Sequence, residues 1–148
     1  MIQPFDDAYF MRKALQEAEL ALEKGEIPVG AVIVCNGYIV AKGHNQVETL
    51  NDPTAHAEML AFTAATNFLG SKYLKDCTLY VTLEPCQMCA GAAFCTQIGK
   101  IVFGASDEQR GYQHWQCRVH PKTEVTGGVL AEESEALLKK FFEQMRKK

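Results

Sequence analysis

The chain has 148 residues, a formal net charge of −3 and an isoelectric point near 5.8. A chain of this length buries about 70% of the surface that it exposes when unfolded, so we expect one domain over residues 1–148. Affinity for a nucleic-acid backbone comes mainly from lysine and arginine, and the acidic balance therefore restricts any such role to a local patch. The candidate patches are Lys72 with Lys75, Arg110 with Arg118 and Lys122, and the final Arg146, Lys147 and Lys148.

The amino-terminal sequence MIQPFDDAYF has neither the basic region nor the apolar run of a signal peptide. The longest apolar run, residues 29–35, is too short to cross a bilayer. We therefore expect a cytoplasmic protein without a membrane partner. In that compartment cysteines are thiols or metal ligands rather than a disulfide framework. Only Cys86 and Cys89 have ligand spacing, and we assign no role to Cys35, Cys77, Cys95 and Cys117.

The first expected elements are a helix and a β-hairpin. Asp6 or Asp7 can cap the helix, and Gly25 can end it. The apolar face of this helix consists of Met11, Leu15, Ala18 and Leu22. The run VGAVIVCNGYIVAKGH at 29–44 follows, with two β-rich segments joined by Asn36-Gly37, a dipeptide suited to a type I′ turn. This pattern predicts an antiparallel pair of strands.

Helices and strands then alternate. Asp52 before Pro53 is suited to begin a second helix, which we expect to end near Gly70. A strand is expected at 78–83, and Pro85 then begins a third helix that stops near Gly99. Residues 100–105, KIVFGA, read as a short buried strand.

The last expected elements are a weak strand within TEVTGGV, residues 123–129, and a final helix at 132–146. The apolar stripe of that helix consists of Leu137, Leu138, Phe141, Phe142 and Met145. The alternation of strands and helices along the whole chain predicts an α/β layered sandwich around a mixed sheet.

The stretch PCQMC places Cys86 and Cys89 three residues apart in the first turn of a predicted helix. That spacing puts both sulfurs on one side, and the positive end of the helix favours thiolates. A structural zinc site would need a second close pair of ligands, which the sequence lacks. The remaining candidate is His56, at another predicted helix start. One histidine and two cysteines leave the fourth position of a catalytic zinc for water.

Glu58 follows His56 by two positions. Residues two apart in a regular helix point about 200° away from each other, so both can face one metal only from the start of the helix. A C-x-x-C alone is a moderate signal, and a lone histidine is more often an ordinary residue than a ligand. The combination of H-A-E with P-C-x-x-C predicts one zinc ion per chain. The other histidines, His44, His114 and His120, lack such partners.

These residues resemble the H-x-E…P-C-x-x-C signature of the cytidine deaminase-like zinc hydrolases. Within that superfamily, PVGAVIV, NDPTAHAEM, TLYVTLEPCQMCAGA and KIVFGASD resemble the bacterial tRNA-specific adenosine deaminases, which convert the wobble adenosine of an anticodon to inosine. The resemblance runs from about Tyr9 to Phe142. It implies a three-layer α/β/α sandwich with a mixed five-stranded, cytidine deaminase-like sheet. It also implies a tRNA anticodon loop as partner and a homodimer.

The resemblance further implies roles for individual residues. His56, Cys86 and Cys89 would bind zinc, and Glu58 would shuttle protons. The substrate would be contacted by Asn45, the backbones of Ala57 and Glu84, the side chain of Val29 and, at the ribose, Asp107.

Two features depart from the family pattern: Gln87 stands at an often apolar or proline position, and the segment 111–123 is short. That segment is expected to help hold RNA. Its Tyr112, His114 and Trp115 would either stack on unpaired bases or pack beneath the loop.

The expected reaction is hydrolytic deamination of adenosine to inosine at the wobble position, position 34, of tRNA. Zinc would lower the pKa of bound water towards about 7. Glu58 would pass a proton to N1 of adenine and then protonate the departing amino group.

Two alternative functions stay open. One is a deaminase of a free base or nucleoside such as guanine, cytosine or cytidine, because the same metal and glutamate serve them all. The other is a catalytically silent zinc domain that binds RNA or a partner, against which the presence of Glu58 argues.

Overall fold

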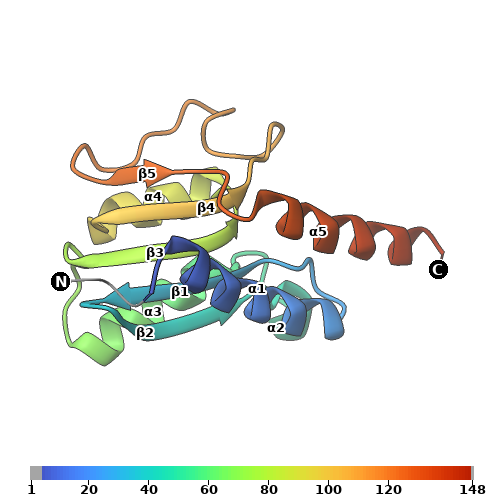
Figure 1. Cartoon of the computed structure of the whole chain (residues 1–148), viewed down its shortest axis with the longest axis horizontal. Helices are drawn as coiled ribbons and strands as arrows, with labels where there is room; N and C mark the ends of the chain where they lie inside the picture. The colour runs from blue at the N-terminus through green and yellow to red at the C-terminus, as the bar shows by residue number, and fades with distance from the viewer. Residues whose placement is uncertain (1–4, 148) are drawn as a thin grey trace.

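The computed structural model describes residues 5–147 and shows a three-layer α/β/α sandwich, which confirms the expected fold class (Figure 1). The middle layer is a mixed five-stranded sheet with the strand order β2-β1-β3-β4-β5. Helices α1 and α5 cover one face of the sheet, and α3 and α4 cover the other. Lys148, part of one candidate basic patch, lies outside the described residues.

The elements follow the expected order, with one additional short helix. The helices are α1 (Asp7–Glu23), α2 (Val47–Leu50), α3 (Ala57–Leu69), α4 (Gln87–Thr96) and α5 (Ala131–Arg146). The strands are β1 (Gly30–Cys35), β2 (Tyr38–His44), β3 (Cys77–Leu83), β4 (Lys100–Ala105) and β5 (Glu124–Thr126). In the part of the chain that the structure covers, no helix combines the length and apolarity of a membrane span.

The sheet contains both strand orientations. β1 pairs antiparallel with β2 and with β3, whereas β3 pairs parallel with β4, and β4 with β5. The β1–β2 turn has positive φ at both central residues, 53° at Asn36 and 81° at Gly37, as a type I′ turn requires. The parallel pairing requires a crossover, which α4 supplies. The start of α4 therefore follows directly from the carboxyl end of β3.

Each face of the sheet has its own apolar core. The core under α3 and α4 includes Ala61, Phe62 and Ala93 with alternate residues of β1 and β3, such as Ile33 and Leu79. The core under α1 takes the opposite residues of the same strands, with Phe10 and Met11. These strands therefore bury both faces, which explains why the run at 29–35 reads as continuously apolar.

The first helix begins as expected. The Asp6 side chain accepts a hydrogen bond from the Tyr9 backbone N–H at 2.9 Å and caps α1. Met11, Leu15 and Ala18 are buried, as the apolar pattern predicts, and Gly25 follows the helix end with φ at 77°.

The predicted boundaries of the next two long helices are wrong. Asp52 does not cap α3, because its carboxylate accepts hydrogen bonds from the backbone N–H and hydroxyl of Thr54, both at 2.8 Å, and closes a local turn. His56 is the residue that precedes the helix. Likewise, Cys86 rather than Pro85 precedes α4.

Helix α4 also ends earlier than Gly99. Gln97 adopts a left-handed conformation with φ at 55°, and the chain then buries Ile98. Gly99 serves a different purpose, since a Cβ at this position would lie 2.3 Å from the Lys75 carbonyl oxygen. The glycine that was expected to stop the helix instead permits a close backbone contact.

The apolar stripe of α5 is only partly covered. Phe141 is buried, and Leu137 and Leu138 are half-buried. Phe142 and Met145 remain 49% and 47% exposed. The carboxyl-terminal part of α5 extends away from the sheet (Figure 1).

Candidate metal centre

Two helix starts bring the predicted metal ligands together. His56 immediately precedes α3, Cys86 immediately precedes α4, and Cys89 is the third residue of α4. The Nδ1 atom of His56 lies 3.6 Å from the Sγ atom of Cys86 and 3.7 Å from that of Cys89. The three ligand atoms lie within 4.8 Å of one another. This group is the one cluster of potential metal ligands found among the described residues.

The spacing of these atoms fits a zinc ion. Bonds of about 2.3 Å to sulfur and about 2.0 Å to nitrogen at a tetrahedral angle separate the two donor atoms by about 3.5 Å. The observed separations of 3.6 and 3.7 Å are close to that value. The donor set of two thiolates and one imidazole suits zinc and leaves one coordination position without a protein ligand.

The surroundings of Cys86 favour its thiolate. Hydrogen bonding from Cys89, and then from His56, lowers the pKa of the Cys86 thiol to about 4 against the opposing effect of burial. The same pair of sulfurs and the burial of Cys89 raise the pKa of the Cys89 thiol. Cys86 is therefore a thiolate at neutral pH, and a cation that binds here displaces the proton of the Cys89 thiol.

Glu58 is enclosed beside this cluster. Its side chain is 3% exposed, and it is the second residue of α3. Burial raises the pKa of the Glu58 carboxyl to about 7. The start of α3 thus brings His56 and Glu58 to one site despite their spacing of two, as the sequence argument requires. A carboxyl whose pKa lies near neutrality is suited to both accept and donate protons.

Asn45 is tied to the start of α3. It is buried, and its Oδ1 atom accepts a hydrogen bond from the Ala57 backbone N–H at 2.8 Å. Because the Ala57 N–H needs an acceptor, the Asn45 side chain must turn its oxygen towards Ala57, which leaves its NH2 group on the side away from Ala57. The backbone N–H of Asn45 donates to the Val29 carbonyl oxygen at 3.1 Å, so Val29 is adjacent. Three of the predicted substrate contacts therefore lie together.

The remaining two predicted contacts, Glu84 and Asp107, are also adjacent to each other. Glu84 directly follows β3, and Asp107 lies two residues beyond β4. The buried Glu84 carboxylate accepts a hydrogen bond from the Asp107 backbone N–H at 3.0 Å. Sequence reasoning assigned only the backbone of Glu84 and missed this side-chain role. The only available signal was a carboxylate two positions before a metal-ligand cysteine.

The aromatic residues of the short segment 111–123 differ in their exposure to solvent. Tyr112 is buried, and its backbone N–H donates to the Pro85 carbonyl oxygen at 2.8 Å, so it packs beneath the loop. Trp115 is 54% exposed, and its ring meets that of the exposed His114 edge to face at 4.9 Å. Only the latter two are free to stack on an unpaired base. Gln87 is exposed at the start of α4.

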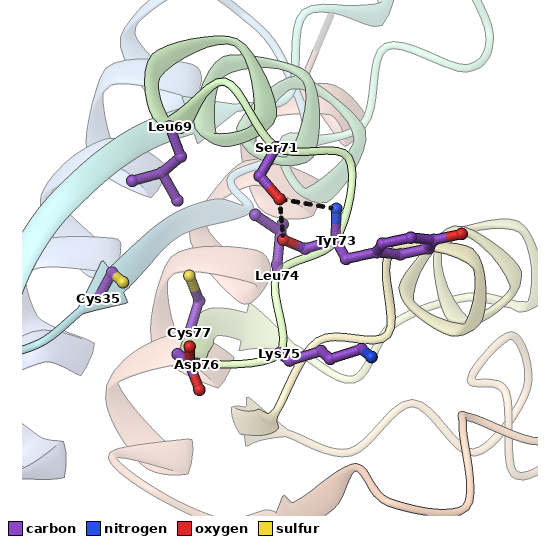
Figure 2. Close-up of a pocket in the computed structure, with 8 residues that line it drawn as sticks. All are labelled: Cys35, Leu69, Ser71, Tyr73, Leu74, Lys75, Asp76 and Cys77. Carbon is purple, nitrogen blue, oxygen red and sulfur yellow. Dashed lines mark hydrogen bonds between the residues drawn. The ribbon is translucent and has the colours of Figure 1, made fainter.

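A surface hollow of about 320 Å³ lies at the opposite end of β3 (Figure 2). Cys35 and Cys77 face it from neighbouring strands, and Lys75 and Tyr73 line it. Lys72 and Lys75, one of the candidate basic patches, both lie against the Tyr73 ring, at 5.3 and 5.7 Å from its centroid. None of the predicted site residues borders this hollow.

Comparison with known proteins agrees with these features. The profile of the cytidine and deoxycytidylate deaminase zinc-binding region matches residues 5–105. The tRNA-specific adenosine deaminase of Bacillus subtilis strain 168 is 46% identical over 148 residues, which cover 96% of this chain and 92% of that protein. Its counterpart in Aquifex aeolicus strain VF5 is also 46% identical, over 93% of this chain and 95% of that protein.

Two solved structures extend the comparison. A tRNA:A34 deaminase from a study of A-to-I editing at the wobble position superposes with a TM-score of 0.80 and 38% identity, covering 88% of this chain and 99% of that one. Guanine deaminase from Bacillus subtilis gives a TM-score of 0.66 and 41% identity, covering 69% of this chain and 66% of that one. With the profile match across the metal centre and the near full-length relatives, the chain belongs to the zinc-binding cytidine and deoxycytidylate deaminase family and, within it, to the tRNA-specific adenosine deaminases.

Proposed function

We propose that this protein hydrolyses the wobble adenosine, position 34, of a tRNA anticodon to inosine and ammonia. The observation that carries the chemistry is the enclosed Glu58 beside a cluster of one histidine and two cysteines with zinc spacing. The preference for a tRNA substrate rests on relatives that are 46% identical over nearly the whole chain and are named for that activity.

His56, Cys86 and Cys89 would hold the zinc ion. Zinc bound there supplies the activation that lets water act as a nucleophile near neutral pH. Glu58 would take a proton from the attacking water and deliver it to N1 of adenine as C6 is attacked. Glu58 would then take the remaining proton from the hydroxyl on C6 and donate it to the amino group, so that ammonia departs and the C6 oxygen becomes the carbonyl of inosine. A carboxyl with a pKa of about 7 can perform both steps, because neither of its protonation states is strongly favoured at neutral pH.

The adenine base would lie between β1 and the two helix starts. The NH2 group of Asn45 would contact the base, since its carbonyl oxygen is held by Ala57. The side chain of Val29 and the backbones of Ala57 and Glu84 would line the same pocket. The Ala57 N–H is occupied by Asn45, so its contribution would come from the remaining backbone atoms. Asp107 would approach the ribose.

Recognition of an anticodon loop suits this arrangement, because a base must leave its stack before an enclosed site can reach it. The exposed Trp115 and His114, with Arg110, Arg118 and Lys122 in and beside the same segment, would supply stacking and phosphate contacts. The proposal also includes a homodimer and a cytoplasmic location, in keeping with the sequence resemblance.

The test compares inosine formation by zinc-loaded protein on two versions of one tRNA. One version carries adenosine at position 34, and the other carries it elsewhere in the anticodon loop. We expect inosine only in the first. A Glu58→Ala variant that binds zinc but forms no inosine is the matched control for a contaminating deaminase. Inosine at neither position would contradict the proposed substrate.

A second candidate is a guanine deaminase, since one such enzyme is 41% identical over 69% of this chain. Free guanine, adenosine, cytosine and cytidine therefore belong in the same assay. Deamination of a free base with an inert tRNA would keep the roles of zinc and Glu58 and move the protein to this second function. No ammonia from any substrate would instead support a silent zinc domain.

A further inference from the structure

Glu84 is a buried carboxylate with two backbone partners on one loop. Glu84 is 5% exposed. Oε1 accepts a hydrogen bond from the Asp107 N–H at 3.0 Å, and Oε2 accepts one from the Gln113 N–H at 3.2 Å. The two donors are the first and last residues of the segment 107–113, which we call the clamp loop. A single side chain therefore holds both ends of the clamp loop.

Backbone contacts attach the same loop to the segment that carries Cys86. Gly111 forms an antiparallel bridge with Cys86, and the Tyr112 N–H donates to the Pro85 carbonyl oxygen at 2.8 Å. A Cβ at Gly111 would lie 2.3 Å from Oε2 of Glu84, so this glycine permits the close approach of the loop. The clamp loop is thus fastened across residues 84–86, a segment that includes the metal ligand Cys86.

Asp107 begins the clamp loop and is itself held in place. Its Oδ1 atom accepts hydrogen bonds from the backbone N–H groups of Gln109 at 3.2 Å and Arg110 at 3.0 Å. The position of Asp107 is therefore set from one side by Glu84 and from the other by its own turn. Removing the Glu84 carboxylate from water costs free energy, and its two charge-assisted hydrogen bonds from backbone N–H groups offset that cost.

We propose that Glu84 is a positioning residue, which fixes Asp107 and the clamp loop relative to the metal centre and thereby sets how tightly the target nucleotide is bound. This inference rests on the proposed function for its effect on catalysis. Its structural part, the fixing of the clamp loop, does not depend on the identity of the substrate.

The variant that tests this role is Glu84→Gln. Glutamine keeps the size of the side chain but replaces one acceptor oxygen with an NH2 group, which meets a backbone N–H that needs an acceptor. The chain offers a matched control in Glu26, which is 2% exposed and accepts hydrogen bonds from the backbone N–H groups of Glu48 and Thr49. Glu26→Gln makes the same chemical change to a buried loop-holding carboxylate at the start of α2.

Hydrogen exchange of the zinc-loaded proteins tests the structural part. We expect the amides of the clamp loop to exchange at least about tenfold faster in Glu84→Gln than in the wild type and to be unchanged in Glu26→Gln. The zinc content should stay at one ion per chain in both. Unchanged exchange in Glu84→Gln overturns the proposal. If that variant does not fold, Glu84→Asp, whose shorter side chain cannot hold both donors, replaces it.

Kinetics on the tRNA substrate test the functional part. We expect Glu84→Gln to lower kcat/KM about tenfold, mainly through a higher KM, and Glu26→Gln to leave it within about twofold of the wild type. Asp107→Ala should add little to the effect of Glu84→Gln, because the two residues act as one unit. Fully additive effects would show that Glu84 does not act through Asp107. A wild-type protein that is inactive on tRNA contradicts the proposed function, and the exchange experiment still decides the fixing of the loop.

Discussion

The two ends of β3 each carry a pair of neighbouring cysteines, and only one pair belongs to a metal centre. At the carboxyl end, Cys86 and Cys89 lie at a helix start with His56 at 3.6 and 3.7 Å. At the amino end, Cys77 lies opposite Cys35 on the neighbouring antiparallel strand (Figure 2). About 20 Å of strand separates Cys77 from Leu83, which precedes the metal centre.

The two pairs have opposite acid–base properties. Cys86 has a pKa of about 4 because hydrogen bonds stabilise its thiolate. Burial, together with the neighbouring Cys35 thiol, raises the pKa of Cys77 to about 12. The Cys77 backbone is also fully used, since its N–H donates to Leu74 and its carbonyl accepts from Gly99. Two adjacent sulfurs are therefore not sufficient for a metal site. At the metal centre, hydrogen bonds from Cys89 and from His56 make the thiolate of Cys86 available.

The largest expected difference between the two pairs is in zinc content. We expect Cys86→Ala to lose zinc and to reduce deamination at least about 10⁴-fold, because two remaining ligands do not hold the ion. Cys77→Ala should retain one zinc per chain and near-normal activity. Elemental analysis of the purified proteins, alongside inosine formation, measures both. Equal zinc loss in the two variants would contradict the distinction.

Removal of the carboxyl beside the metal should separate zinc binding from chemistry. We expect Glu58→Gln to keep zinc while kcat falls about 10³-fold, since general acid–base catalysis contributes about 10² to 10⁴. Single-turnover inosine formation with matched zinc content measures this change. Substantial turnover by the variant would require a different proton carrier.

Thiol reactivity should also distinguish Cys77 from an accessible cysteine. At pH 8 a group with a pKa of about 12 is almost entirely protonated, so we expect Cys77 to be alkylated at least about 100-fold more slowly than the exposed Cys95. The rate at Cys77 should rise about tenfold per pH unit, because its thiolate fraction does. Peptide mass analysis after timed alkylation of the zinc-loaded protein gives both rates. Comparable rates at pH 8 would contradict the burial of Cys77 and the raised pKa of its thiol.

The smallest expected effect is on stability. Cys77 is 3% exposed and packs in the core under α3 and α4, so Cys77→Ala should lower the free energy of unfolding by about 1 kcal/mol. Cys35→Ala should cost less, because Cys35 is only half-buried. Chemical denaturation with zinc present measures the pair. A larger loss of unfolding free energy for Cys35→Ala than for Cys77→Ala would contradict this expectation.

Short-range patterns carried most of what the sequence could predict. The turn at Asn36-Gly37 and the ligand spacing of Cys86 and Cys89 depend on neighbouring residues, and both have the expected local structure. The predicted start of α3 is wrong because the Asp52 carboxylate accepts hydrogen bonds from Thr54 in a local turn, which competes with helix capping. The alternation of helices and strands predicted the fold class. The motifs H-A-E and P-C-x-x-C, each at a predicted helix start, predicted the metal ligands.

Contacts between distant segments could not be predicted in the same way. The hydrogen bond between Asn45 and Ala57 joins residues 12 positions apart in the sequence, and the one between Glu84 and Gln113 joins residues 29 positions apart. Nothing in the local pattern around Glu84 distinguishes a buried acceptor of backbone hydrogen bonds from a solvated carboxylate. Such residues become evident only once the sheet brings the ends of β3 and β4 together.

The fastening of the chain on both sides of the segment 114–122 has a consequence for variation and engineering. On one side, Gln113 is held by Glu84, and on the other the Thr123 hydroxyl donates to the Ile98 carbonyl oxygen at 2.6 Å. The exposed residues between these anchors, such as Trp115, can therefore be substituted without loosening either anchor, whereas Val119 packs against the core under α3 and α4. We expect changes of nucleic-acid recognition to be tolerated at these exposed positions, where the surface varies while the chemistry stays in place.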